Sequence, residues 1–530
     1  MDEIQYTLVL VSLTMLYVFY RLFHRNADEL REIRGPASPS WIFGNMLQLT
    51  LTPTYGEYEF EWLKKYGSVY RFKGCFGVKD RLMISDPAAL HTLLSREQFA
   101  LGPGMGNGGR LIYNAGCTWL TDSEKDHQRL RTALNEGFTV AAVRSYIPIF
   151  ERVAQTLTEQ FDEIASHSGV GDISPLLGQA TLASVAEAIL GLSLNELGDE
   201  FISTNLQLIN VASNQSATQV LADALLRWIP NAICDVMLYI PVQPFNFVHR
   251  AKVLTDEIGK RVIRSSKIAK SQGLEGVGGF YDDLVDKAQT YSSDGNVFSE
   301  RDILDQTTLL LLAGQDTTAN TLVFGFLELA RDVDLQERLR AEIHASRIGI
   351  ARDATTFDNM PLLNAFIKET LRLYPAVALS DRVATEDVVL ALSEPIMTSR
   401  GKRLTRIPIP KGQIVYIGTA EYQRSESIWG PDAHEFKTSR WLKEEGPLKG
   451  EGVSSYANLL SFFGGTRICL GWRFALLEMQ IFVCELVSKF EFSLPDDEVH
   501  LKTTCQYAMT LQPMLPDGKK GAFLAIKRVT

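Results

Sequence analysis

Cys469 lies directly ahead of a long apolar helical pattern at residues 472–487. A thiol at the start of a helix is close to backbone N–H groups, and Arg467 is two residues away, so we expect a lowered pKa and a stabilised thiolate. Glycines stand around it at positions 464, 465 and 471. Because glycine has no Cβ, this loop would let the main chain approach a flat ligand closely. The segment would suit a thiolate loop pressed against a planar ring, but a cysteine before a helix is, taken alone, usually structural, and composition by itself favours that reading.

Helical patterns dominate the chain from about Ala88 onward. Before them, two short strand patterns at residues 69–72 and 81–84 are separated by a glycine-containing loop, which is typical of a hairpin. The length of 530 residues alone would allow two to four domains. However, no repeat, low-complexity tract or long linker divides the sequence. We predict a mainly α protein with small β-sheets, forming one large helical domain over residues 41–530.

The composition limits the classes of function. A hydrophobic fraction of 45% with 22% charged residues is typical of a large buried core. The net charge of -10 argues against a general nucleic-acid binder, which needs a surplus of Lys and Arg on one face. The six cysteines form no CxxC pair, so neither a zinc ribbon nor a disulfide scaffold is indicated. Residues 104–109 match GxGxxG but follow a helical pattern rather than a strand, which favours a loop over a dinucleotide site.

The amino-terminal residues 4–20 are uncharged and apolar. As a helix they would be roughly 25 Å long, slightly short for a bilayer of about 30 Å, and snorkelling of Arg21 would close the gap. Acidic residues precede the segment and arginines follow it, which by the positive-inside rule places the rest of the chain in the cytosol. We predict a transmembrane anchor at residues 1–24 and a proline-containing hinge at residues 25–40. A cleaved signal peptide or a buried helix is the alternative, but the acidic start does not fit a signal peptide.

The longest helical pattern covers residues 296–339, with Ser299 as a candidate N-cap and Asp302 three residues later. Within it, residues 313–318 read AGQDTT. A glycine in a helix interior costs about 1 kcal/mol relative to alanine, so this stretch is locally unfavourable. We expect Gly314 to make room for a ligand, and a threonine hydroxyl to bond back to a carbonyl and open the helix to water. The alternative is a solvated kink without function.

The cysteine segment resembles the haem-binding loop of cytochromes P-450, F-x-x-G-x-R-x-C-x-G. Its fixed positions are filled by Phe462, Gly465, Arg467, Cys469 and Gly471. The resemblance extends over nearly all residues after the hinge, with the motifs in the expected order. It implies the cytochrome P-450 fold, a haem b cofactor and Cys469 as the axial thiolate of the iron.

Two further motifs are similar to those of the same family. Residues 313–318 look like its oxygen-activation motif, which implies that Asp316 and Thr317 relay protons as the catalytic pair. Glu369 and Arg372 match its E-x-x-R motif, and Arg440 would be the third member of that structural ion network.

An i, i+3 acid–base pair has little meaning alone, because it occurs on many helices. Thr438 and Ser439 replace the usual proline and glutamate of the family, a departure that concerns the geometry of the loop rather than the ion network.

His127 and Arg131 are spaced i, i+4 on a helical pattern. On their own they indicate only a cationic helix face, since lone histidines are more often satisfied surface or core groups than ligands. The segment looks like the family helix that grips the haem propionates, so the resemblance implies this role for both residues. Arg382 matches another propionate contact of the family.

The resemblance also implies an activity and its partners. It predicts a membrane-bound monooxygenase that inserts one oxygen atom from O2 into an apolar substrate, with electrons from NADPH through a separate flavoprotein reductase. Arg129 and Arg473 are candidates for reductase docking. Similarity to fungal microsomal members predicts a single-pass protein of the endoplasmic reticulum with a cytosolic catalytic domain, acting on a terpenoid or related secondary metabolite. Residues 228–247 would lie over the substrate entrance and dip into the membrane.

Three other readings stay open from sequence. The substrate could be a fatty acid or a xenobiotic. The reaction could be an oxygen-independent haem-thiolate isomerisation or dehydration, or a peroxide-driven hydroxylation, although Asp316 and Thr317 argue against reactions that need no proton relay. The most remote reading is a membrane-tethered binding protein without enzymatic activity.

Overall fold

The structure is a computed structural model. It describes residues 28–52, 54–77, 80–95, 98–102, 109–113, 116–121, 123–213, 216–226, 239, 243–273, 279–290, 298–346, 354–443, 452–495, 504–507 and 510–529. The predicted anchor at residues 1–24 and most of the GxGxxG segment lie outside the described residues. The same holds for the greater part of residues 228–242, which were predicted to dip into the membrane.

Helices form most of the described chain, which confirms the predicted fold class. The α-helices are α2 (Asp28–Arg31), α3 (Met46–Thr50), α4 (Glu57–Tyr66), α5 (Pro87–Ser95), α7 (Glu124–Asn135), α8 (Val140–Ser145), α9 (Ile147–His167), α10 (Ile173–Val185), α11 (Leu194–Leu197), α12 (Asp199–Ser213), α13 (Ala217–Leu226), α15 (Gln243–Ser271), α16 (Phe280–Thr290), α17 (Glu300–Arg331), α18 (Val333–Ser346), α19 (Ala354–Asp358), α20 (Pro361–Leu373), α21 (Thr419–Gln423), α22 (Glu426–Trp429) and α23 (Trp472–Val487). Short 3-10 or π segments are η1 (Cys75–Gly77), η2 (Glu136–Phe138), η3 (Ala186–Leu190), η4 (Thr438–Trp441), η5 (Leu460–Phe462) and η6 (Gly465–Arg467).

The strands are short and gather into small sheets, as predicted. They are β1 (Val69–Lys73), β2 (Asp80–Ile84), β3 (Phe99–Leu101), β4 (Val170–Asp172), β5 (Leu379–Ala384), β6 (Val388–Met397), β7 (Arg403–Ile409), β8 (Ile414–Gly418), β9 (Phe490–Ser493), β10 (Thr504–Tyr507), β11 (Leu511–Met514) and β12 (Phe523–Arg528).

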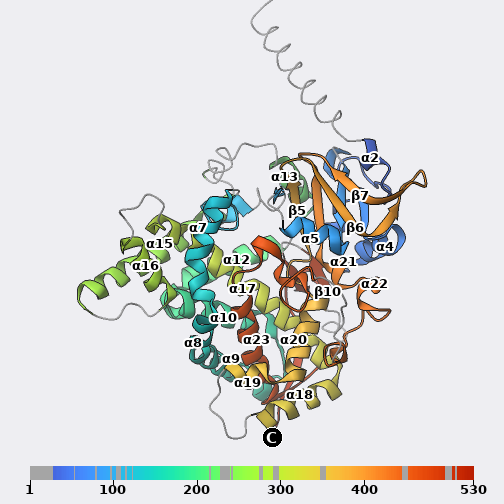
Figure 1. Cartoon of the computed structure of the whole chain (residues 1–530). Coiled ribbons are helices and arrows are strands. Elements are labelled where there is room, and N and C mark those ends of the chain that lie inside the picture. The colour runs from blue at the N-terminus through green and yellow to red at the C-terminus, as the bar shows by residue number, and fades with distance from the viewer. Residues whose placement is uncertain are drawn as a thin grey trace, which may run out of the picture.

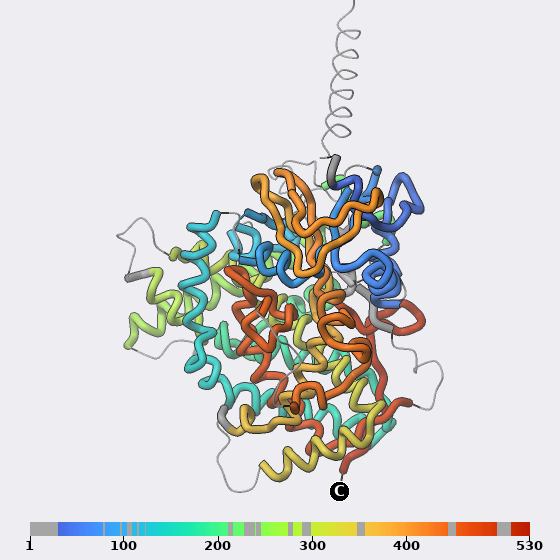
Figure 2. The backbone as a smooth tube through the Cα atoms, turned by 45° about the vertical axis from the view of Figure 1, so that its right-hand side comes forward, coloured from blue at the N-terminus to red at the C-terminus, as the bar shows by residue number. Residues whose placement is uncertain are grey.

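The largest sheet has the order β1-β2-β8-β5-β3, and its β1–β2 pair is the predicted antiparallel hairpin. The remaining described strands pair as β6-β7, β4-β12-β9 and β10-β11. In both Figure 1 and Figure 2 the blue amino-terminal strands lie beside the orange strands of residues 379–418 at one end, with the helices below them. The β1-β2-β8-β5-β3 and β6-β7 sheets thus form one end of a mainly helical body, whereas β12 lies against α9 and β9 against α17.

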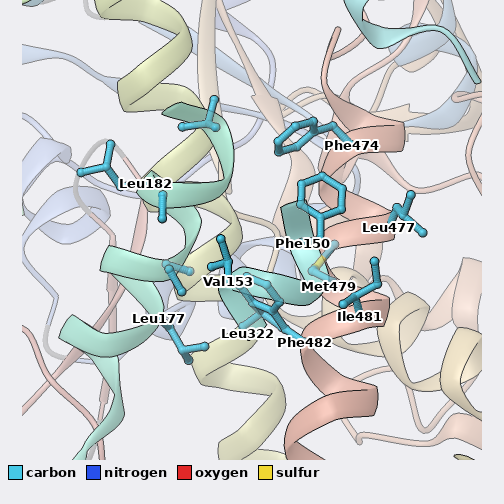
Figure 3. Packing of buried hydrophobic residues seen from close by; sticks show 14 of the residues in the cluster. Phe150, Val153, Leu177, Leu182, Leu322, Phe474, Leu477, Met479, Ile481 and Phe482 are labelled. Atoms are coloured by element: carbon cyan, nitrogen blue, oxygen red, sulfur yellow. The ribbon is translucent and has the colours of Figure 1, made fainter. Parts of the chain in front are cut away.

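The main core surrounds α17, which packs against α10 and contacts α20 and α23. Figure 3 shows Phe150 of α9, Leu177 of α10, Leu322 of α17 and Phe482 of α23 converging in this core. Full burial of such a side chain stabilises a fold by about 1.5–3 kcal/mol. The four helices are therefore held in a fixed arrangement, and α17 and α23 carry two of the predicted motifs into the middle of the protein.

The predicted 296–339 helix is two helices. The N-cap prediction is confirmed, because Ser299 and Asp302 form a reciprocal capping box at the start of α17. The predicted length is wrong, since α17 ends at Arg331 and Asp332 leaves the helical conformation with φ −125° and ψ 86°. The Asp332 carboxylate accepts a hydrogen bond from the Leu335 N–H at 2.9 Å, which caps α18. A side chain that caps the next helix offers the backbone an alternative to continuing the first one.

The amino-terminal end of the described chain packs against the sheets. Leu30 and Ile33 are each 1% exposed and belong to the second core cluster. The main chain at Arg34 accepts a hydrogen bond from the Arg71 N–H of β1 at 3.0 Å. Residues 34–38, within the predicted proline-containing hinge, form neither helix nor strand. Even so, the packed body begins ahead of the predicted domain start at residue 41, because these two apolar side chains are buried in it.

One helical stretch among the described residues, Ile173–Leu190, is long and apolar enough to cross a membrane. Its place in the fold is against α9 and α17, and 72% of it is buried inside the protein. A helix that is apolar on all sides is also what the centre of a large globular core requires. This stretch is a core element.

Candidate active site

The Cys469 loop joins η5 to α23 and is fixed at several points. The Cys469 N–H donates to the Phe462 carbonyl oxygen at 2.8 Å, which closes the loop. The Ser461 hydroxyl donates to the Leu371 carbonyl oxygen of α20 at 2.7 Å, which ties the loop to a neighbouring helix. Gly471 is the N-cap of α23, so the cysteine lies just before the helix start, as predicted.

Two of the three glycines of this loop, Gly464 and Gly465, serve a different purpose from the one predicted. Gly465 has φ +65°, and a Cβ there would lie 2.0 Å from the Leu94 carbonyl oxygen of α5. A Cβ on Gly464 would lie 2.5 Å from the Val453 carbonyl oxygen. Both positions need glycine because the loop presses against other main chain of the protein, and Gly465 also needs the left-handed conformation. Approach to a flat ligand is therefore not what requires these two glycines.

The Cys469 side chain lies deep in the molecule and is nevertheless exposed, because it faces an internal cavity. Burial raises the pKa of its thiol, against the opposing effects of the Gly471 N–H and of the Arg131 guanidinium. The predicted lowering of this pKa is therefore wrong for the protein alone: desolvation disfavours the anion more than the helix start and the arginine favour it. A bound metal ion would reverse this balance, because a coordinating thiol is deprotonated.

The cavity has a volume of about 390 Å³ and brings together most of the predicted site residues. Those that line it are His127, Arg131, Asp316, Thr317, Arg382, Phe462, Arg467, Cys469 and Gly471. Gly465 is not part of the lining, and neither are Glu369, Arg372 and Arg440. Most of the lining surface is apolar, with side chains such as Leu208, Leu309 and Leu310 in the wall. The cavity is therefore an apolar chamber with a thiol, a carboxylate and a set of basic groups at defined places.

Basic groups gather around the cavity without acidic partners. Within the described part of the chain, no ion pair joins a carboxylate to Arg131, Arg382 or Arg467. The His127 side chain is buried, and its Nδ1 has no hydrogen-bond partner there.

Burial lowers the pKa of Arg131, and it lowers the pKa of Arg382 to about 10. The pKa of His127 falls to about 4, through burial first and then through Arg467. Arg382 donates to the Ser380 hydroxyl at 2.6 Å and Arg467 to the Thr121 carbonyl oxygen at 3.0 Å, but neither contact supplies a negative charge. Buried cations without a counter-charge are costly, so the arrangement fits an anionic ligand. The carboxylates of haem match this donor set, and a flat ring over Cys469 matches the apolar chamber.

The structure gives Gly314 a packing role. A Cβ on Gly314 would lie 2.8 Å from Cγ2 of Val185, so this glycine lets α17 approach α10 closely. Gly314 also lines the cavity, so the packing role adds to the expected one of leaving room for a ligand. The Thr317 hydroxyl donates to the Ala313 carbonyl oxygen at 2.9 Å, which is the predicted back-bond. However, α17 continues without interruption through this stretch, so the back-bond is made without opening the helix.

Asp316 is held by groups that the sequence did not indicate. Its carboxylate forms an ion pair with Lys520 and accepts hydrogen bonds from the Thr510 hydroxyl at 2.7 Å and the Gln512 amide at 2.9 Å. The Asn320 amide donates to it at 3.2 Å. Although burial works to raise it, these partners hold the pKa of Asp316 below its ordinary value, with Lys520 making the largest contribution. Thr510 and Gln512 also line the cavity.

Glu369, Arg372 and Arg440 lie together away from the cavity. Arg372 donates two hydrogen bonds to the Glu369 carboxylate, each at 2.8 Å, and both side chains are fully buried. Nε of Arg440 lies 3.5 Å from Glu369, and the Trp441 indole donates to the same carboxylate at 2.8 Å. Arg372 also donates to the main-chain oxygen of Gln423 at 2.8 Å. This network joins α20 to the segment around residues 423–441.

The departure at Thr438 and Ser439 leaves that network in place. These residues lie in η4, and the preceding Lys437 N–H donates to Glu369 at 2.9 Å.

The two predicted reductase contacts differ in their surroundings. Arg129 is held in a bidentate pair with Asp302, at 2.9 and 3.0 Å, whereas Arg473 lies over the Trp472 ring. Both arginines are half-buried.

The fold and the cavity together define a class of protein. A mainly helical body that directs a cysteine and several basic groups without carboxylate partners among the described residues into an apolar chamber is suited to hold a flat, anionic cofactor through sulfur. The sequence model of the cytochrome P450 family matches residues 34–517, and the chain belongs to that family. It is an oxidoreductase of the monooxygenase class. The family implies a haem with a thiolate-bound iron and a redox partner.

The curated relatives are fungal. Cytochrome P450 monooxygenase 91 of Postia placenta is 32% identical over 94% of this chain and 94% of its own length. Ganoderic acid synthetase of Ganoderma lucidum is 28% identical over 94% of this chain and 95% of its own length. Cytochrome P450 monooxygenase claU of Ampulloclitocybe clavipes is 27% identical over 92% of this chain. The likeness therefore covers nearly the whole chain in each case.

Proposed function

We propose that the chain is a haem-thiolate monooxygenase that inserts one oxygen atom from O2 into an apolar organic substrate, with Cys469 as the axial ligand. The observation that carries this proposal is the cysteine directed into an apolar cavity that also holds unpaired basic groups. Haem bound there supplies the binding and reduction of O2, and thiolate donation favours O–O cleavage. Electrons would come from NADPH through a separate flavoprotein reductase.

The residues of the chain have distinct tasks in this proposal. The Gly471 N–H and the Arg131 guanidinium stabilise negative charge on the sulfur of Cys469. Arg131, Arg382 and the neutral His127 bind the two carboxylates of the cofactor, which supplies negative charge to two arginines that have no carboxylate ion-pair partner among the described residues. The apolar wall excludes water and orients the substrate by contact rather than by hydrogen bonds.

Proton delivery is the proposed task of Asp316 and Thr317. Both line the cavity on the α17 side. A carboxylate can take up a proton from water and pass it to a neighbouring hydroxyl, and an alcohol can pass a proton on by exchanging its own. Reactions that need no oxygen-linked protons have no use for this pair, which favours monooxygenation over the isomerase alternative.

For the substrate, we propose a terpenoid or related secondary metabolite in a fungal biosynthetic pathway. The support is the apolar wall of the cavity and the name of one relative, ganoderic acid synthetase, which describes a biosynthetic activity of that protein. We also propose that residues 1–24 anchor the protein in the endoplasmic reticulum membrane with the catalytic body in the cytosol. An anchored enzyme would meet an apolar substrate where it concentrates, in lipid.

The Cys469→Ala variant tests the central claim. In the wild-type protein the ferrous carbon monoxide complex should show the red-displaced Soret band of a thiolate-bound haem, and this variant should lose it. Cys484→Ala is the matched control, because Cys484 is a buried cysteine of α23 that lies next to Met360 and not in the cavity. A wild-type spectrum in Cys469→Ala would contradict the proposal. Product formation without NADPH and reductase would instead support the isomerase.

A further inference from the structure

Asp316 is buried within a set of donors that come mostly from the far end of the chain. The Lys520 ammonium pairs with Oδ1, and the donors Thr510, Gln512 and Asn320 all bond to Oδ2. Both oxygens of the carboxylate are therefore occupied. Of these partners, Lys520 is the only one with a charge, so it decides most strongly whether Asp316 is ionised.

Lys520 occupies a place between solvent and the buried acid. It directly follows an exposed turn at residues 516–519, while its own side chain is only 12% exposed. Its backbone is fixed by a bridge to Met514 of β11, and the Gly521 N–H donates to the Pro513 carbonyl oxygen at 2.9 Å. The lysine stem thus spans from a fixed surface turn to a carboxylate on the central helix. The sequence pattern of the family matches only to residue 517, so Lys520 lies beyond it.

We propose that Lys520 is a positioning residue for proton delivery: it keeps Asp316 ionised, directs its carboxylate toward the β10–β11 hairpin and sets the pH at which it takes up a proton. This inference rests on the proposed function of Asp316. An acid with a low pKa is ionised before each turnover and can accept a proton from solvent, whereas loss of the cation would raise the pKa of a buried acid and keep it protonated up to a higher pH. Lys520 therefore extends the pH range over which Asp316 is ionised and ready to accept a proton.

The other titratable groups near this pair do not replace Lys520. Tyr113, which also lines the cavity, is near enough to Asp316 for the carboxylate to raise the pKa of its phenol, so it faces the acid as a neutral group. Asp172, at the start of α10, is near enough to Lys520 for the ammonium to lower its pKa, although burial raises that pKa overall. Removal of Lys520 would leave no cation to offset the burial of Asp316 among these described neighbours.

The test measures the protonation of Asp316 itself. Infrared difference spectra of the full-length holoenzyme over a pH series would follow the carboxyl band that disappears in Asp316→Asn. In Lys520→Met we expect the midpoint of this band to rise by about 1–3 pH units, the usual effect of one close cation. Lys520→Gln keeps a hydrogen-bond donor but loses the charge. Because the proposal assigns the effect to the charge, this variant should give the same rise in the midpoint. Lys520→Arg should restore a midpoint close to that of the wild type.

Lys519→Met is the matched control, because Lys519 is the neighbouring lysine but is 80% exposed and pairs with Asp517. Its midpoint should equal that of the wild type. An unchanged midpoint in both Lys520→Met and Lys520→Gln would overturn the inference. Should Lys520→Met fail to fold, Lys520→Gln and Lys520→Arg together still separate charge from packing.

A second measurement separates this inference from the proposed function. The rate of NADPH oxidation with purified reductase is measured in H2O and in D2O with no organic substrate added. Asp316→Asn should slow it at least about tenfold, since a positioned acid contributes roughly 10²–10⁴ in rate. If Asp316→Asn changes nothing, the relay fails whatever Lys520 does. If Asp316→Asn slows NADPH oxidation but Lys520→Met changes neither the midpoint of the Asp316 infrared band nor the pH dependence of NADPH oxidation, only the role of Lys520 is wrong.

Discussion

Two buried carboxyl groups outside the active site make the stability of the protein depend on pH. Glu421 of α21 accepts a hydrogen bond from the Tyr70 hydroxyl at 2.5 Å and is 1% exposed. Burial raises its pKa to about 8, and the nearby Glu59 adds to the rise. Burial likewise raises the pKa of Glu59 to about 7. Both groups are therefore protonated in the folded protein at a pH where the unfolded chain has lost the proton.

The Glu421→Gln variant tests this assignment. A carboxyl whose pKa is raised on folding stabilises the protein below its unfolded pKa of 4.5, and this stabilisation is lost as the pH rises through about 8. Each such group changes the free energy of unfolding by about 1.4 kcal/mol per pH unit in that window. The thermal midpoint of the wild type should fall between pH 5 and 8, and Glu421→Gln should fall less steeply. Exposed Glu337→Gln serves as the control, and parallel curves for all three proteins would refute the assignment.

At the scale of elements, the sequence predicted those features that depend only on residues close to one another in the chain. The β1–β2 hairpin and the Ser299 cap were both predictable, because hydrophobic spacing and capping residues act within a few positions. The contacts of Asp316 were not predictable, since Lys520 is 204 residues away in sequence. No local pattern in the carboxy-terminal turn marks a lysine that pairs with a buried acid.

The glycines of the cysteine loop show the same limit. The glycines indicated that the main chain of the loop lies close to something else. The sequence could not show what that is, because the Leu94 carbonyl oxygen beside Gly465 belongs to α5, far away in the sequence. The family resemblance of the loop implied which residues gather around Cys469, and Phe462, Arg467 and Gly471 line the same cavity. It could not predict whether a ligand or the protein itself fills the space beside each glycine.

Replacement of Gly465 by alanine should disturb the loop strongly. The new Cβ would meet the Leu94 carbonyl oxygen at 2.0 Å and would also have to adopt φ +65°. Gly518→Ala is the matched control, because Gly518 has φ +80° but no atom within 4 Å of the added Cβ. The control should cost only about 1–2 kcal/mol for the left-handed conformation. Haem content and thermal midpoint should fall in Gly465→Ala well below those of Gly518→Ala, and equal values would contradict the account.

At the scale of the whole molecule, the boundary between the predicted anchor and the body is testable by truncation. The body includes Leu30 and Ile33, whose side chains are buried against the sheets. Hydrogen bonds to the main chain hold the same segment in place. The Arg71 guanidinium donates to the Ile33 carbonyl oxygen at 2.7 Å, and the Ser399 N–H donates to the Glu32 carbonyl oxygen at 2.7 Å. The segment from residue 28 onward is thus part of the folded unit.

Two truncations should therefore behave differently. A protein that begins at residue 28 should leave the membrane fraction and keep the thermal midpoint of the full chain, because it loses the predicted anchor and none of these contacts. A protein that begins at residue 41 should also leave the membrane but unfold at lower temperature, because burial of each of the two lost side chains is worth about 1.5–3 kcal/mol. Sedimentation with vesicles and calorimetry measure the two effects separately. Equal midpoints would show that Leu30 and Ile33 add nothing to the core, whereas persistent sedimentation of both proteins would show that the body itself binds lipid.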